Sequence, residues 1–573
     1  MNSIMKHIRI ILLICSSLFI SEGIGQTVDI ESIKDAKPLA LNGSLTASSI
    51  FTSGLNSVNK PINYFLSGNL NFNVFNVINV PININLSDRK VSLSQGYSFN
   101  QFSVNPTYKW ISVHAGTNYM SFSPYTLNGH QFLGGGVELT PDNWNIKAMY
   151  GRLRRGQSAD TLSTGPTFKR MAYGLKVQYM PANYMIGLSF LKSQDFDNSL
   201  SVENRFFENR VLTPEDNLVV SLDFGTTLFH VLELSAEYSN SIITKNKSDE
   251  LETSKISSLA GIFSRGNATS NSYNAFKTKI NYNITRTNTL VGLGYERIDP
   301  NYRTHGGYFF NEDLINYTVN LNQTFQEGKF SLAANGGIQK DNIKNTKASE
   351  ASRIIGSINA NGQFSEKLTM GLNFSNFQNF MFVNDLYSQI TRVPGMPIDS
   401  LDFKMISQNL GYNLNKNFRQ TEDLSEAIVF NINYLTSLNK RDNVINEASK
   451  TNVLNTTLGY SLQLIPKNVT FMVGMNYFSN KLAESSISGF GPNLNIQKLF
   501  FDQKLSTSLN LTFLKTTSVG EEIESQGNSA INTSFMANYR LKEKHNFSFN
   551  TSIVKNSSIN AFVNGTLSYN YSF

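Results

Sequence analysis

The most concentrated group of chemically active side chains in the sequence is basic. Arg152, Arg154 and Arg155 come just before a polar stretch at 156–167, and Lys169 and Arg170 come just after it. Asp160 is the one acidic residue within that stretch. A group of cations attracts anions, so this cluster predicts a site for anionic solutes or contacts with glycolipid phosphates. We favour the glycolipid contact, or simple solvation, over a solute site.

The sequence offers little for enzyme chemistry. Ser123 and His130 are close in sequence, but serine is abundant throughout, so their spacing alone does not identify a nucleophile and its base. The default interpretation of His130 is a hydrogen-bonded loop residue. A hydrolase whose Ser and His come from distant strands would be invisible in sequence spacing, so it stays as a minor alternative. We expect a protein that is not an enzyme.

Two other motifs point away from bound groups. The histidines show neither the HExxH motif nor a paired spacing, which argues against a metal site. Gly134, Gly135 and Gly136 lack the Lys and Ser/Thr that complete a phosphate-binding loop, and they stand within a strand pattern. We expect them to allow a close backbone approach or a strand kink, and this segment to pack an outer loop inward over the lumen. The sequence therefore predicts no cofactor and no metal.

The elements that position these residues follow a period of two, which is typical of β-strands. Near the C-terminus one face would carry Leu505, Thr507, Leu509, Leu511 and Phe513, and the other Ser506, Ser508, Asn510 and Thr512. The same alternation recurs at 70–74, 457–464 and 531–541. One face suits lipid and the other suits water.

Strand lengths and connections separate a membrane barrel from a soluble sandwich. The alternating segments run about 10 to 14 residues, close to the roughly 9–11 of a tilted membrane strand. Short turns at Pro141 and Asp142, at 181–183, at 466–468 and at 543–545 alternate with polar stretches. The long polar stretches lie at 156–167, 192–215, 245–273, 299–312, 381–401 and 518–527. We predict an all-β fold: one large antiparallel transmembrane β-barrel of about 22–26 strands, with short periplasmic turns and long extracellular loops.

Composition and charge support a membrane barrel and exclude other classes. Charged residues make up 16% of the chain and aromatic residues 12%, whereas soluble proteins average about 25% charged residues. No segment after the N-terminal one is apolar enough for a membrane helix. The formal net charge is +7, but no basic helix or nucleic-acid module is present, so we expect no nucleic-acid partner. Outer-membrane lipid and glycolipid are the expected partners.

The N-terminal region indicates export. Residues 1–25 read as a signal peptide, with a basic start, an apolar stretch at 10–20 and small residues before Gln26. The single cysteine, Cys15, lies within that apolar stretch, so the mature chain can form no disulfide. We assign 26–40 as a short periplasmic segment and 41–573 as the outer-membrane barrel. The segment 26–40 is too short for the plug domain of a TonB-coupled receptor.

The last strand carries a further pattern. Leu567, Tyr569, Tyr571 and Phe573 would share one face. This arrangement resembles the C-terminal signal by which barrel-assembly machinery recognises its clients, and an ordinary edge strand is the alternative. An even number of strands would place both termini in the periplasm.

A family resemblance adds to these inferences. Residues 105–156 contain SPYTLNGH at 123–130 and FLGGGVEL at 132–139. The segment resembles uncharacterised outer-membrane β-barrel proteins of the Bacteroidota. The resemblance implies a barrel in the cell outer membrane and assigns no active residues.

The expected function follows from the barrel. Closing more than about 16 strands leaves a lumen that side chains cannot fill, so we expect a channel-type or transport-associated barrel that passes or gates polar solutes. The alternative is a structural or accessory subunit of a secretion or surface-assembly complex, which the family resemblance keeps open.

Overall fold

The computed structural model describes most of the chain beyond the N-terminus. The described residues are 37–54, 61–88, 100–158, 165–207, 210–249, 258–264, 266–308, 311–344, 352–380, 404–441, 444–482, 485–520, 523–556 and 561–573. The predicted signal peptide at 1–25, residues 26–36 of the predicted periplasmic segment, and Asp160 lie outside them.

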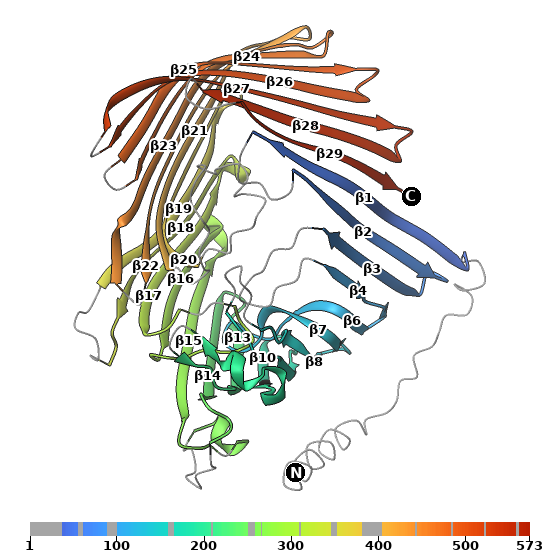
Figure 1. The fold of residues 1–573 in the computed structure, drawn as a ribbon, viewed down its shortest axis with the longest axis vertical. Helices are drawn as coiled ribbons and strands as arrows, with labels where there is room; N and C mark the ends of the chain where they lie inside the picture. Colours follow the sequence, from blue (N-terminus) through green and yellow to red (C-terminus); the bar gives the residue numbers. More distant parts are fainter. Residues whose placement is uncertain are drawn as a thin grey trace.

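The strands form one antiparallel sheet that closes into a ring (Figure 1). β1 (Leu39–Ser53) pairs with β29 (Phe562–Ser572) and closes the barrel. β4 (Gln101–Val104) and β5 (Thr107–Tyr108) each pair with both neighbouring strands, so they are two parts of one interrupted strand. The 27 segments of the sheet therefore make a ring of 26 strands, which confirms the predicted fold class and the even strand number.

The remaining strands follow the chain around the ring. The first are β2 (Ile62–Val74), β3 (Ile78–Ser87), β6 (Ile111–Ser121), β7 (Asn128–Leu139), β8 (Trp144–Arg154), β9 (Arg170–Tyr179) and β10 (Tyr184–Asp195). The next are β13 (Asp216–Leu228), β14 (Leu232–Thr244), β15 (Ser270–Ile284), β16 (Thr289–Ile298), β17 (Leu314–Phe325), β18 (Phe330–Asp341), β19 (Ser352–Ser365) and β20 (Leu368–Phe380). The last are β21 (Lys404–Gln420), β22 (Leu424–Arg441), β23 (Val444–Leu464), β24 (Val469–Leu482), β25 (Ser485–Phe500), β26 (Leu505–Gly520), β27 (Ile523–Leu541) and β28 (His545–Asn556).

Little other secondary structure is present in the described ranges. β11 (Phe206–Phe207) and β12 (Arg210–Val211) form a small separate hairpin. The short 3-10 segments are η1 (Asp197–Ser199), η2 (Val202–Arg205), η3 (Ala260–Ile262), η4 (Thr285–Thr287) and η5 (Gln326–Gly328). None of the described helices has the length and apolar character needed to cross a bilayer.

The sheet register confirms the predicted alternation. Leu70, Phe72 and Val74 share one face with Ile82, Val80 and Ile78 of the next strand. The opposite face carries Asn71 and Asn73, and many apolar side chains on the first face are solvent-exposed. A barrel with apolar residues outside and polar residues inside is the arrangement of a membrane-spanning barrel.

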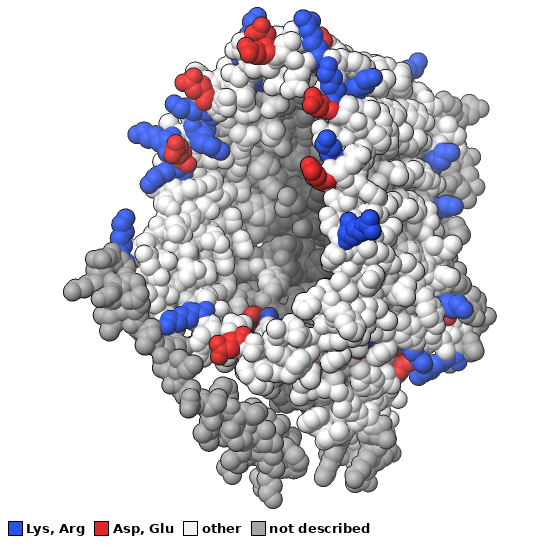
Figure 2. Space-filling view, turned by 180° about the vertical axis from the view of Figure 1, so that it is seen from behind, with Lys and Arg blue, Asp and Glu red and all other residues white. Residues whose placement is uncertain are grey.

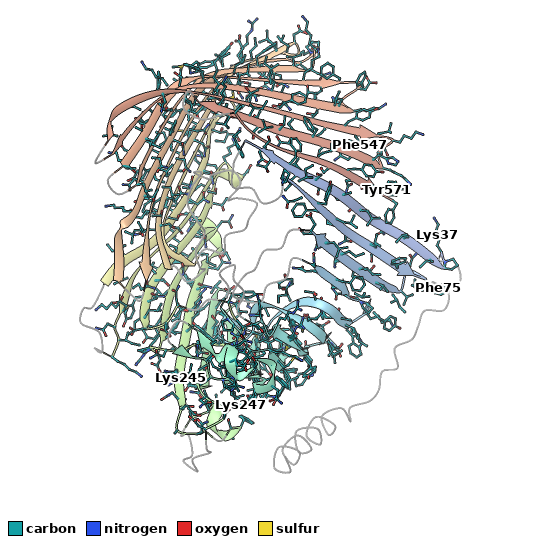
Figure 3. The ribbon with its side chains drawn as sticks, viewed as in Figure 1. Lys37, Phe75, Lys245, Lys247, Phe547 and Tyr571 are labelled. Carbon is teal, nitrogen blue, oxygen red and sulfur yellow. The ribbon has the colours of Figure 1, made fainter. Side chains whose placement is uncertain are left out.

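The short connections gather at one end of the barrel. Lys37, Phe75, Phe547 and Tyr571 lie toward this end in Figure 3, whereas Lys245 lies away from it. The predicted turns at Asp142, Asn468 and Glu543 are present, and each of these residues has a positive φ. We call this end the short-turn end and the opposite end the long-loop end. Both β1 and β29 have their terminal ends at the short-turn end.

One predicted loop is wrong. The stretch 518–527 was expected to be a long loop, but β26 continues to Gly520 and β27 starts at Ile523. The two strands extend past the apolar outer band into water, where outward-facing positions need not be apolar. The Ser, Gly, Glu and Gln residues of this stretch therefore show no alternation of apolar and polar side chains. Two other predicted loops are shorter than expected, since β10 runs to Asp195 and β15 begins at Ser270.

Candidate functional site

The lumen has two walls of different chemistry. Strand register assigns each residue to the outer face or the lumen face. We call β18–β29 with β1–β3 the amide wall, and β6–β10 with β13–β17 the packed wall. The central lumen-facing positions of the amide wall are Asn, Ser, Thr, Gly and Gln with a few apolar residues, and carry no Asp, Glu, Lys or Arg in the described strands. Figure 2 shows a hollow whose visible walls are mainly uncharged.

Neighbouring strands of the amide wall are joined by side-chain hydrogen bonds. The amide of Asn493 donates to Asn476 Oδ1 at 2.8 Å, and Thr457 Oγ1 donates to the same oxygen at 3.0 Å. At the closing seam, Asn570 Nδ2 donates to Thr46 Oγ1 at 2.7 Å. Each amide has more donors and acceptors than these bonds use, so the rest of this wall can hydrogen-bond water or a polar solute.

The packed wall instead carries charged groups that are paired with one another. Glu138 lies 3.1 Å from Lys147 Nζ and 3.5 Å from His114 Nε2. The Gln178 amide donates to Asp223 Oδ2 at 2.6 Å. Glu138 and Lys147 thus balance each other, whereas the neutral Gln178 amide binds Asp223 without cancelling its charge.

Two connections from the long-loop end fold into the lumen against the packed wall. Residues 122–127 join β6 to β7, and residues 299–313 join β16 to β17. Asn128 N–H donates to Gly306 O at 2.8 Å. The hydroxyl groups of Thr304 and Tyr302 donate to the carbonyl oxygens of Thr126 and Tyr125, at 2.7 and 2.9 Å. The two connections thus form one unit, which we call the inner cap.

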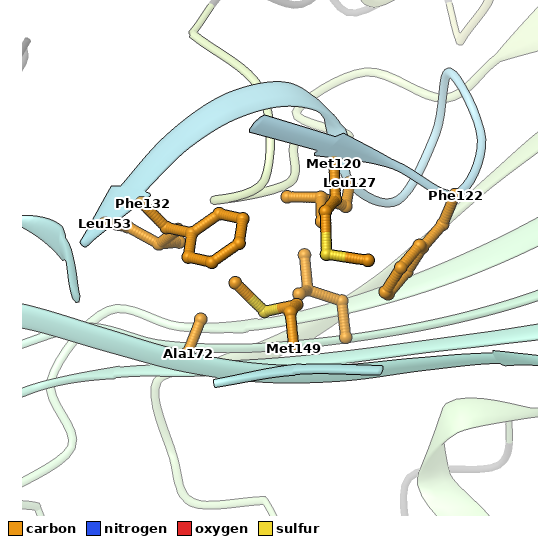
Figure 4. Packing of buried hydrophobic residues seen from close by; sticks show 8 residues of the cluster. Met120, Phe122, Leu127, Phe132, Met149, Leu153 and Ala172 are labelled. Carbon is orange, nitrogen blue, oxygen red and sulfur yellow. The ribbon is translucent and has the colours of Figure 1, made fainter. Parts of the chain in front are cut away.

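A hydrophobic cluster holds the inner cap against the wall (Figure 4). It consists of Met120, Phe122, Leu127, Phe132, Met149, Leu153, Ala172 and Leu191, all buried. A Cβ on Gly306 would lie 2.5 Å from Thr126 O, and a Cβ on Gly134 would lie 2.1 Å from Tyr150 O. Glycine is therefore required where the cap meets the wall and where strands approach closely, which confirms the expected role of the glycine run.

A second cluster anchors the cap at its tip. Tyr125 and Tyr302 pack edge to face, with ring centroids 6.2 Å apart, among lumen-facing residues of β15–β17. The Tyr125 hydroxyl donates to Glu296 Oε1 at 2.5 Å. Burial raises the pKa of both tyrosines, so their hydroxyl groups stay protonated and act as donors.

The predicted basic cluster is divided by the structure. Arg170 forms two hydrogen bonds to Asp195, at 2.7 and 2.9 Å, and a third to Glu215 at 3.0 Å. Arg154 also contacts Asp195, at 3.2 Å. The sequence showed only Asp160 within the adjoining stretch, but the structure brings two more carboxylates to these cations, Asp195 at the end of β10 and Glu215 just before β13. These two arginines act within the barrel as structural ion pairs.

The other three basic residues of the cluster lie elsewhere. Arg152 shares the outer face with Tyr150, near the long-loop end. Lys169 Nζ lies 5.5 Å from the centroid of the Phe196 ring, and the Arg155 carbonyl accepts a hydrogen bond from Thr167. The predicted contacts with anions or glycolipid stay predictions for Arg152, Arg155 and Lys169.

The ion pairs continue into the inner cap. Arg303 and His305 of the cap both contact the Glu215 carboxylate, His305 through Nε2 at 3.3 Å. Burial raises the pKa of Glu215, but the hydrogen bond from His305 and the neighbouring arginines outweigh it and hold the pKa below its usual range. Burial lowers the pKa of His305 to about 3, so this histidine is neutral at physiological pH.

The same network assembles a Ser–His–Glu arrangement that sequence spacing did not reveal. Ser193 Oγ lies 2.8 Å from His305 Nδ1, on the far side of the ring from Glu215. Ser193 is buried beneath the cap, and the Glu215 carboxylate is already held by two arginines, so a substrate has no access to the hydroxyl. We interpret the arrangement as a structural bond.

The two residues considered from sequence have separate partners. Ser123 Oγ hydrogen-bonds Thr126 Oγ1 at 2.9 Å. His130 Nδ1 bonds the Gln131 carbonyl, and its ring stacks on Tyr308 of the cap with centroids 4.0 Å apart. In the described parts of the chain, no group of three or more His, Cys, Asp or Glu side chains could hold a metal ion.

The predicted assembly signal lies at the closing strand. Tyr569 and Tyr571 pair with Ala47 and Leu45 of β1 on the outer face. Phe547 of β28 packs against Tyr569, with centroids 4.8 Å apart. Together with Leu567 and Phe573 these residues form an aromatic, outward-facing end to the last strand.

Comparison with known proteins shows likenesses in structure only. No protein-family model matches the chain, and no curated protein matches it in sequence. It is similar to the translocation pore of the P pilus usher PapC, with a TM-score of 0.39 and 10% identity over 93% of this chain and 99% of that one. It is also similar to a mutant of the ferric enterobactin receptor PfeA from Pseudomonas aeruginosa, with a TM-score of 0.34 and 10% identity over 93% and 80%. A third likeness is to OccAB4 from Acinetobacter baumannii, with a TM-score of 0.29 and 13% identity over 71% and 98%. At such identities, the functions in those names belong to those proteins and are not transferred to this chain.

Proposed function

We propose that this protein is a channel-type or transport-associated barrel of the outer membrane that passes polar solutes with little preference for the sign of their charge. The observation that carries the proposal is the amide wall. Its hydrogen-bonding groups favour a water-filled lumen, and the absence of charge at its central lumen-facing positions in the described strands gives no reason to select cations over anions.

The size of the ring supports an open path. Barrels of 16–18 strands already leave an aqueous channel, and this barrel has 26. The inner cap is bonded to the packed wall, and at its return to β17 the Asp313 carboxylate also accepts a hydrogen bond from Ile343 N–H, just past β18, at 2.9 Å. A solute would therefore move between the cap and the rest of the amide wall.

The proposal includes an orientation and partners. The short-turn end and both chain ends face the periplasm, and the long-loop end faces outward. Leu567, Tyr569, Tyr571 and Phe573 serve barrel-assembly machinery as the recognition strand. Arg152, on the outer face beside Tyr150, is the best-placed cation for a glycolipid phosphate. We also keep the resemblance to Bacteroidota barrels as a proposal.

Single-channel recording in planar bilayers tests the function. Purified full-length mature protein should give a steady conductance, and its reversal potential in a salt gradient should lie near zero. Neutral sugars should enter protein-containing vesicles in a size-dependent way. A folded barrel without conductance that co-purifies with a partner would favour the accessory-subunit function instead.

A further inference from the structure

One loop at the long-loop end packs against the outside of the barrel. The connection from β14 to β15 leaves Thr244 and returns at Ser270, and its described part includes residues 258–264. Leu259 and Ala260 pack in one cluster with Phe190, Leu218, Val220 and Ile242. Register places these four strand residues on the outer face, because they pair with one another and lie in line with exposed Leu188 and Leu222.

This position is fixed by specific bonds. Ala260 N–H donates to Asn240 Oδ1 at 3.0 Å, and Asn240 Nδ2 donates to Ser272 Oγ at 2.9 Å and Asn274 Oδ1 at 2.8 Å. Asn240 is fully buried although it belongs to the outer face. The Phe263 ring meets Phe190 edge on, with centroids 5.9 Å apart. We call residues 258–263 the outer clip.

The outer clip lies at a boundary between apolar and charged residues. On its short-turn side the outer face carries Leu188 and Leu222, each 44% exposed. On its long-loop side the outer face carries the ion pair of Lys192 and Asp216. In a membrane barrel, such a change marks the boundary between acyl chains and headgroups.

The clip also presents unburied apolar side chains at this level. Ile262 is 74% exposed and Phe263 is 47% exposed, although Leu259 and Ala260 beside them are packed. These two side chains extend the apolar band of the strands outward from the wall. Water would be an unfavourable environment for them, whereas the acyl-chain boundary would not.

We propose that the outer clip is a lipid-contacting element, with Ile262 and Phe263 inserted at the boundary between acyl chains and headgroups of the outer leaflet. The proposal rests on the membrane placement in the proposed function. It commits to lipid because the clip is continuous with the lipid-facing band. Its consequence is that residues 258–263 are held beside the barrel and away from the lumen.

Depth-dependent fluorescence quenching tests the clip. In a Trp110→Phe, Trp144→Phe background, Ile262→Trp introduces one fluorophore into full-length protein refolded in phosphatidylcholine vesicles. Leu222→Trp is the control within the apolar band, and Val202→Trp, 73% exposed in η2, is the control in water. Phosphatidylcholines brominated near the headgroup or deeper along the chain act as quenchers from the lipid, and iodide acts from water.

We expect the Ile262→Trp fluorescence to fall at least twofold with shallow bromines, less with deep bromines, and little with iodide. Iodide quenching equal to that of Val202→Trp would overturn the proposal. Protection from both iodide and bromines would overturn it too, because a protein partner would then cover the clip. If Leu222→Trp also escapes bromine quenching, the membrane placement itself fails.

Discussion

The packed wall and the amide wall have the same alternation of side chains along their strands, but their lumen-facing surfaces differ. Both have apolar residues outside; inside, the amide wall is mainly polar, and the packed wall combines polar residues with the hydrophobic clusters that lie under the cap. On the packed wall, buried Asn217, Ser221 and Ser241 have protein partners, including the inner cap. On the amide wall, Asn413 and Asn431 are exposed to the lumen.

The difference between the walls comes from the connections. Residues 122–127 and 299–308 bring polar groups into the lumen that bond the wall in place of water: His305 N–H donates to Asn217 Oδ1, and the Tyr125 hydroxyl donates to Glu296 Oε1. The amide wall has no such cover among its described residues. One wall therefore supplies rigidity, and the other supplies the surface that a solute meets.

The largest expected effect comes from breaking the ion pairs of the packed wall. Asp195→Ala leaves Arg170 and Arg154 without their shared carboxylate in a buried site. Removing one partner of a buried pair costs about 3–5 kcal/mol. Guanidinium unfolding from vesicles, followed by tryptophan fluorescence, should show a loss of this size.

A matched control lies two residues away. Asp197 is partly exposed and lies 3.7 Å from Lys247 Nζ, so Asp197→Ala should cost less than about 1 kcal/mol. If both variants lost the same free energy of unfolding, the ion pairs of the packed wall would stabilise the protein no more than an ion pair at the surface does.

A second pair of variants compares the same residue type on the two walls. Asn217 Nδ2 donates to Ser241 Oγ and Ile242 O, and Asn217 Oδ1 accepts from His305 N–H at 3.0 Å. Asn217→Ala should lower the free energy of unfolding by about 1–3 kcal/mol, because it leaves buried partners unsatisfied. Asn431→Ala, facing the open lumen, should change it by less than about 0.5 kcal/mol. Similar losses at both positions would remove the distinction between the walls.

The sequence predicted the strands much better than the cap. Alternation such as Leu70, Phe72 and Val74 against Asn71 and Asn73 is local, so the barrel, its even strand number and most short turns could be predicted. The partners of the basic cluster could not be predicted in this way. Asp195 lies opposite Arg170 in the β9–β10 hairpin, 25 residues away in sequence, and the exact register of that hairpin, which the alternation alone does not fix, brings them together.

The direction of the long loops was also beyond sequence reasoning. Residues 299–308 fold inward and residues 258–263 fold outward, although the sequence indicated a polar connection in both regions, at 299–312 and at 245–273. The Ser193 and His305 contact joins residues 112 apart, which no spacing rule detects.

The third prediction concerns pH and the cap. His305 stays neutral in the folded protein down to a pKa of about 3, whereas in the unfolded chain it takes up a proton near pH 6.5. Between those values the unfolded state binds more protons, so the free energy of unfolding falls as pH falls, by about 1.4 kcal/mol per pH unit. Glu215, with its pKa held low, does not titrate between pH 7 and 5.

Unfolding curves for wild type and His305→Gln at pH 7, 6 and 5 check this effect. The difference between the two proteins isolates His305 from other titrating groups. We expect the wild type to lose more stability than the variant on acidification. Parallel pH dependence in both would show that the cap does not bury this histidine.

The smallest expected effect comes from adding charge to the amide wall, which lines the proposed path of the ions. Asn413 and Asn431 pair across β21 and β22 and face the lumen, so Asn413→Asp with Asn431→Asp places two carboxylates there. A unit charge at about 8 Å in water contributes only about 0.5 kcal/mol, and salt screens it further. The reversal potential in a salt gradient should still move toward cation selectivity, while the Asn413→Gln variant leaves it unchanged. Glu138→Gln changes the charge by one unit, on the wall that the proposed solute path avoids, so it should alter selectivity less than the double variant does. If Glu138→Gln instead has the larger effect, ions pass along the packed wall, and the roles assigned to the two walls must be exchanged.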